Sequence, residues 1–196
     1  MNHVMRKGTG PVTGQSTMTD SAFLELCAAG TAEDVRQALH SGANVDAKDA
    51  EGMTSLMHAA KSNVDLEVVN VLLLAAAEKG PWYKLGKKVD VNAGNKEGMT
   101  ALMFAVEKSS PDVVQVLLDA EADVNDRDKQ GKTVLMFAVE RECNPEVVET
   151  LLKAGANIDA MDKGGMTALM WAETEKSCSE EVMKLLQTPR RVDTGI

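Results

Sequence analysis

One short phrase recurs along this chain and constrains its fold more than any other feature. Gly-Met-Thr-Ala-Leu-Met occupies 98–103 and again 165–170, and close variants occupy 52–57 and 131–136. The threonines of the four copies are separated by 46, 33 and 34 residues. A Leu-Leu pair and a closing phrase such as Val-Asn-Ala recur in step with these threonines. We therefore interpret the chain from Asp20 onward as a series of structural repeats.

Each repeat predicts two helices. Thr is a favourable N-cap residue, so a first helix is expected to begin just after Thr100 and just after Thr133. A second helix is expected after Ser110 and after Asn144, because both residues can cap a helix and each is followed by Pro. One such pair cannot bury its own apolar face. Stacked pairs can, with each buried Leu contributing roughly 1.5–3 kcal/mol.

Two longer strings carry a resemblance to a known family. Residues 128–139 read Asp-Lys-Gln-Gly-Lys-Thr-Val-Leu-Met-Phe-Ala-Val, and 151–160 read Leu-Leu-Lys-Ala-Gly-Ala-Asn-Ile-Asp-Ala. Ankyrin repeats read roughly Asp-x-x-Gly-x-Thr-Pro-Leu-His-x-Ala-Ala, then a helix with Leu-Leu, then Gly-Ala-Asp-Val-Asn-Ala. From Ser21 to about Gln187 the chain resembles this family, in a Leu-Met variant similar to many bacterial ankyrin proteins.

The resemblance implies an all-α ankyrin repeat solenoid of about five helix-pair units joined by β-hairpins or turns. The units are expected at about 21–48, 49–93, 94–126, 127–160 and 161–187, the second with an insertion at 76–88. The first and last units are expected to cap the stack. The segment 1–19 is Gly-, Thr- and Ser-rich and is expected to be a disordered tail, and 188–196 a C-terminal tail.

The chain departs from the family at the His of the repeat. Met57, Met103, Met136 and Met170 stand in its place. The hydrogen bonds that this His usually makes between loops are therefore expected to be missing. We expect stability to depend more on methionine packing, which is adaptable but less specific.

Composition excludes some classes of function. The formal net charge of −9 argues against nucleic-acid binding, which needs a basic face. No stretch reaches the roughly 18–20 apolar residues of a membrane span. The histidines and carboxylates form no catalytic or metal-binding set, so no cofactor, no metal and no enzymatic activity are expected.

The three cysteines are Cys27, Cys143 and Cys178. They are scattered and lack metal-ligand spacing, so unbridged thiols in a reducing compartment are expected. Cys143 and Cys178 occupy similar places in neighbouring repeats, which coincidence of repeat phase explains more simply than a disulfide. The expected location is cytoplasmic, or secreted or periplasmic if a signal segment has been removed.

A column of mostly aromatic residues is the first candidate binding feature. The position after the Leu-Met pair holds His58, Phe104, Phe137 and Trp171, and the position before each Thr holds Met53, Met99, Lys132 and Met166. The resemblance places both on the concave side of the stack, with Glu107 and Glu140 just behind the column. Aromatic residues and Met are enriched at protein interfaces. The alternative interpretation is that these side chains pack between neighbouring helices.

The insertion at 76–88 is the second candidate. It contains Trp82 and Tyr83 among four lysines. Insertions in repeat proteins often lie on the binding side, so the segment would suit a partner with an acidic, partly apolar surface. In the alternative, Trp82 folds back and covers the Leu72-Leu73 helix.

These features predict a monomeric, non-catalytic protein–protein interaction module. It would bind one protein partner through its concave face and the 76–88 insertion. The alternative is a specific regulator: an inhibitor, an immunity factor or a host-directed effector acting on one enzyme or host protein. An enzyme is a remote third possibility.

Overall fold

Ten helices in the described part of the chain follow one another in pairs. The computed structural model describes residues 18–62, 65–77, 89–108, 110–140, 143–174 and 178–187. The helices are α1 (Asp20–Ala29), α2 (Ala32–His40), α3 (Ser55–Ser62), α4 (Leu66–Ala77), α5 (Ala101–Glu107), α6 (Pro111–Asp119), α7 (Val134–Glu140), α8 (Pro145–Lys153), α9 (Ala168–Thr174) and α10 (Glu180–Gln187). Over these residues, no helix is both long and apolar enough to cross a membrane.

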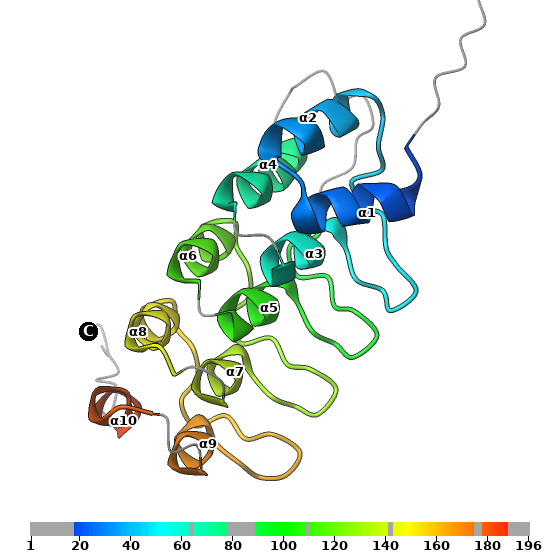
Figure 1. Cartoon of the computed structure of the whole chain (residues 1–196). Helices are drawn as coiled ribbons and strands as arrows, with labels where there is room; N and C mark the ends of the chain where they lie inside the picture. Colours follow the sequence, from blue (N-terminus) through cyan, green and yellow to red (C-terminus); the bar gives the residue numbers. More distant parts are fainter. Residues whose placement is uncertain are drawn as a thin grey trace, which may run out of the picture.

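The helices form two layers (Figure 1). The odd-numbered helices pack on one another in order from α1 to α9, and the even-numbered helices do the same from α2 to α10. Long loops project from the odd-numbered layer, on the side away from the even-numbered helices (Figure 1). The expected all-α solenoid is confirmed. Where described, the connections carry only isolated antiparallel bridges, Lys48 with Thr54 and Arg127 with Thr133.

Threonine side chains begin the odd-numbered helices, as expected. The Thr100 hydroxyl accepts a hydrogen bond from the Met103 N–H (3.4 Å), and Thr54, Thr133 and Thr167 cap their helices in the same way. Asn144 caps α8 by accepting from the Glu146 N–H (3.0 Å). The expected role of Ser110 was wrong in part. It is the N-cap residue of α6, but its side chain makes no capping hydrogen bond.

The methionines in the family's His position fill the interior of the stack. Met57, Met103 and Met136 are at most 1% exposed, whereas Met170 is 43% exposed. The first three are covered by the following unit, and no described unit follows the last. The backbone N–H of the capping Thr donates to the sulfur at both Met57 and Met136 (3.4 Å each). In these two units the sulfur is thus both a packing group and a hydrogen-bond acceptor.

Backbone hydrogen bonds join the tips of successive loops. The N–H of a tip residue donates to a carbonyl of the preceding tip: Lys96 to Glu51 (2.8 Å), Lys129 to Glu97 (2.8 Å) and Lys163 to Gln130 (2.9 Å). Each bond pairs backbone polar groups that would otherwise lie between stacked loops without a hydrogen-bond partner. The loops are therefore held in register with the helices.

Asparagine side chains join the units at the turns that follow the even-numbered helices. The Asn125 side-chain oxygen accepts from the Asn157 N–H (2.8 Å), and its amide nitrogen donates to the Gly155 carbonyl (3.2 Å). Asn92 makes the equivalent pair of bonds to Asp123 and Glu121. The Asn of the closing phrase is thus a bridge between neighbouring units.

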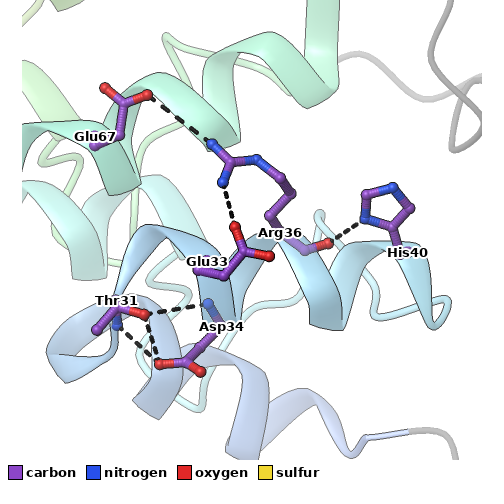
Figure 2. A network of polar contacts seen from close by, with 6 residues as sticks. All are labelled: Thr31, Glu33, Asp34, Arg36, His40 and Glu67. Atoms are coloured by element: carbon purple, nitrogen blue, oxygen red, sulfur yellow. Dashed lines mark hydrogen bonds and ion pairs between the residues drawn. The ribbon is translucent and has the colours of Figure 1, made fainter.

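A polar network connects the first unit to the second (Figure 2). The Thr31 hydroxyl and the Asp34 carboxylate form a capping box at the start of α2. Arg36 of α2 pairs with Glu33 at 2.7 Å and reaches Glu67 of α4 at 4.0 Å. These groups are largely exposed, so we assign them a contribution of at most about 1 kcal/mol.

The expectation for two cysteines was wrong. Cys143 and Cys178 form a disulfide, with their Cα atoms 5.2 Å apart. The repeat phase places each of them just before the N-cap of an even-numbered helix, and stacking brings these equivalent positions together. The two cysteines share a position in neighbouring repeats, and this shared position is what allows the disulfide to form. It is not an alternative to the disulfide. Cys27 is buried and remains a thiol.

Candidate protein-binding face

The predicted column lies on the odd-numbered helices, and burial separates its members. His58, Phe104, Phe137 and Trp171 come from α3, α5, α7 and α9 respectively. Phe104 is 4% and Phe137 is 8% exposed, so these two rings are core residues. His58 and Trp171 are half-buried. The packing interpretation is therefore correct for the two phenylalanines, and only the two ends of the column reach the surface.

Lysine side chains cover the rings of the column. The Lys61 ammonium lies 5.3 Å from the centre of the Phe104 ring. The Lys132 ammonium lies 5.7 Å from the Phe137 ring and 3.8 Å from the Trp171 ring. A cation over an aromatic face contributes about 0.5–2 kcal/mol, and Trp is the best acceptor. Lys132 thus joins Phe137 of its own unit to Trp171 of the next.

The position before each Thr forms a row beside the column. Met53 is buried at 6% exposure, whereas Met99, Lys132 and Met166 are half-buried. The Lys132 ammonium also pairs with the Glu140 carboxylate at 2.7 Å. We call Met99, Lys132, Met166 and Trp171 the Met–Trp face. This face combines apolar contact area with the Lys132 ammonium, whose position is fixed by Phe137, Trp171 and Glu140.

The Trp171 ring is held from its polar edge as well. Its indole N–H donates to the Asp162 carboxylate at 3.0 Å. His58 contacts Asp49 in the same way at 2.9 Å. In both units the carboxylate lies nine positions before the ring and begins the loop turn. This nine-residue spacing is present in the sequence, but these two aspartates were not among the predicted site residues.

Both aspartates are held in their ionised form. Burial would raise the pKa of the Asp162 carboxyl, but hydrogen bonds from the Met166 N–H, the Trp171 ring and the Gly164 N–H, together with the charge of Lys132, hold the pKa below its ordinary value. Burial would also raise the pKa of the Asp49 carboxyl. Hydrogen bonds from Met53, His58 and Glu51 lower this pKa by more than burial raises it. Both carboxylates are therefore ionised at neutral pH and can accept hydrogen bonds from the half-buried rings.

The remaining predicted residues divide into two groups. Glu107 and Glu140 are half-buried at the ends of α5 and α7, and the Glu140 carboxylate pairs with Lys132 of the Met–Trp face. Trp82 and Tyr83 lie outside the described residues. In the segments that the structure describes, no group of three or more His, Cys, Asp or Glu side chains could hold a metal ion.

Comparison with known families agrees with this architecture. The family model described as ankyrin repeats (three copies) matches residues 23–128, 76–162 and 123–194. The chain belongs to the ankyrin-repeat family. Among curated proteins, no match was found. Ankyrin repeats are in general protein–protein interaction modules.

Proposed function

We propose that this ankyrin-repeat chain is a protein-binding module that holds one protein partner on the concave side of its stack. The Met–Trp face would supply the centre of the contact, with Glu107 and Glu140 at its border and the 76–88 insertion as a second contact. The module would act as a monomer and without catalysis.

The observation that carries the proposal is the environment of Trp171. This side chain is half-buried, hydrogen-bonded to Asp162 and covered by Lys132, and the Met166 N–H donates to the same Asp162 carboxylate. An interface residue held in one orientation loses little conformational entropy when a partner binds. Trp is the residue most often found at the energetic centre of interfaces. A rigid, part-exposed Trp beside methionines therefore supports a docking function.

A substitution at Trp171 tests this proposal. A partner captured with the wild-type chain from a native lysate, and then purified, would be titrated against Trp171→Ser. We expect affinity to fall by at least about tenfold, because hot-spot truncations cost about 2 kcal/mol or more. Gln115→Ser, at an exposed position on α6 in the other layer, is the matched control and should bind as the wild type does.

Phe104→Ser separates binding from packing. Because Phe104 is buried, we expect this variant to lose about 3–5 kcal/mol of stability, as other large-to-small core substitutions do. Thermal unfolding of all three variants would be followed by circular dichroism. Wild-type affinity in Trp171→Ser, or a loss of affinity in Gln115→Ser instead, would show that the partner binds elsewhere on the stack.

A further inference from the structure

The last unit is held by less apolar contact than the units before it. In α7 every residue except Glu140 is buried, whereas α9 buries only Ala168 and Ala172. In α10 the buried residues are Val182 and Leu186. A terminal repeat contacts one neighbour, so its stability rests on one interface. The unit that carries Met166 and Trp171 thus has the fewest buried side chains of the described stack.

A covalent bond joins this unit to the rest of the stack. Cys143 lies one residue before Asn144, the N-cap of α8, and Cys178 lies two residues before the start of α10. Cys143 is 3% exposed and Cys178 is half-buried. The Cys143 backbone has φ of +46°, in the left-handed region that L-residues rarely adopt. This conformation and its burial set Cys143 apart from an ordinary loop cysteine.

We propose that Cys143 and Cys178 are a specific oxidation site, and that their disulfide fastens the last ankyrin unit to the stack. Persistent disulfides of this kind form where the environment is oxidising. The disulfide therefore favours a secreted or periplasmic location over the cytoplasmic one. The reactant is a protein disulfide of a dithiol oxidoreductase, such as those that oxidise newly made secreted chains.

The exchange begins at the more accessible thiol. The Cys178 thiolate attacks one sulfur of the oxidant's disulfide, forms a mixed disulfide and releases the other sulfur as a thiolate. The Cys143 thiolate then attacks the Cys178 sulfur, which forms the intramolecular bond and releases the second thiolate. Two electrons pass to the oxidant, which leaves as a dithiol, and the two cysteines lose two protons.

The third cysteine takes no part in this exchange. Cys27 is fully buried, and burial raises its pKa to about 12, so almost none of it is thiolate at neutral pH. It also lies on α1, at the opposite end of the stack from α9 and α10 (Figure 1). Oxidation should thus yield one disulfide and leave one thiol.

Hydrogen exchange of the full chain tests the proposal. Chain equilibrated with oxidised glutathione would be compared with chain reduced by a phosphine. We expect amides in 161–187 to exchange at least about tenfold faster after reduction, because the unit then opens locally. Amides in 94–126 should be unchanged. The Cys143→Ser/Cys178→Ser variant should exchange like the reduced wild type and should not respond to the phosphine.

A matched variant and a thiol count complete the experiment. Cys27→Ala should keep the full response of 161–187 to reduction. Equal exchange in 161–187 before and after reduction would overturn the proposal. Recovery of all three cysteines as alkylatable thiols after treatment with oxidised glutathione would overturn it as well.

One consequence for binding rests on the proposed function. If the partner binds Trp171 and Met166, opening of the last unit should weaken binding. The partner would therefore be titrated against oxidised and reduced chain. Faster exchange in 161–187 with unchanged affinity would leave the oxidation site standing and contradict the binding face alone.

Discussion

Gly98→Ala is expected to lower the free energy of unfolding by about 3 kcal/mol. Gly98 has φ of +81°, where a side chain costs about 1–2 kcal/mol. An added Cβ would also lie 3.1 Å from the Lys129 nitrogen and 3.2 Å from the Asp128 backbone carbons. These are backbone atoms of the next loop, which cannot move away without disturbing the Lys129–Glu97 hydrogen bond. Overpacking of this kind adds about 1–3 kcal/mol.

Gly165→Ala is the matched control for this prediction. Gly165 holds the same turn position with φ of +78°, but a Cβ there would meet nothing within 4 Å. It should therefore cost about 1–2 kcal/mol, the conformational part alone. Urea unfolding of both oxidised variants, followed by circular dichroism, measures the difference. Equal losses in the two variants would mean that the next loop accommodates the added Cβ at position 98 without overpacking.

The contrast between these two glycines illustrates what the sequence can predict. Gly recurs at the fourth position of each turn, two residues before the capping Thr. This recurrence predicts a positive φ at that position, because Gly adopts positive φ without steric cost. Thr100 and Asn144 could be predicted to cap their helices for the same local reason. Such features depend on a few neighbouring residues. Repeats reproduce them in every unit, so the fold followed from the pattern.

Features that depend on contacts between units were harder to predict. The sequence placed Phe104, Phe137 and Trp171 in one column, but their exposures differ because the neighbours of each ring differ. Lys61 and Lys132 cover rings of the following unit, and no local pattern identifies a residue that reaches across. The Cys143–Cys178 bond has the same origin. Its formation depends on the distance between two stacked loops, which spacing along the chain does not give.

Asp126 is another residue whose environment depends on contacts between units. The closing phrases of the other units end in Ala47, Ala93 and Ala160, all at most 9% exposed. Asp126 brings a carboxylate to this position, and its Oδ2 atom is buried with no hydrogen-bond partner among the described residues. Burial raises the pKa of Asp126, and repulsion by Asp123 and Asp90 raises it further. The departure from Ala was visible in the sequence, but its cost appears only when the units are stacked.

Asp126→Ala is therefore expected to stabilise the chain. A buried polar group left without a partner costs about 1–3 kcal/mol, so we expect a gain of about 1–2 kcal/mol at pH 7. The midpoint of chemical unfolding should rise by the corresponding amount. Glu149→Ala removes the same charge from an exposed position on α8, so its effect should stay within about 0.5 kcal/mol.

The gain should depend on pH in a direction that the raised pKa fixes. In the range between the unfolded and folded pKa values of Asp126, the folded chain binds more protons than the unfolded chain. Stability from this group therefore falls as pH rises through that range and is restored below it. Asp49 and Asp162 act oppositely, because their lowered pKa values make acid destabilising.

The informative quantity is thus the difference in unfolding free energy between Asp126→Ala and wild type, measured by urea unfolding from pH 7 down to pH 4. That difference should shrink as the pH falls, because protonation of Asp126 removes the buried charge from the wild type. A difference that stays constant or grows with acid would mean that the Asp126 carboxylate is solvated in the folded chain.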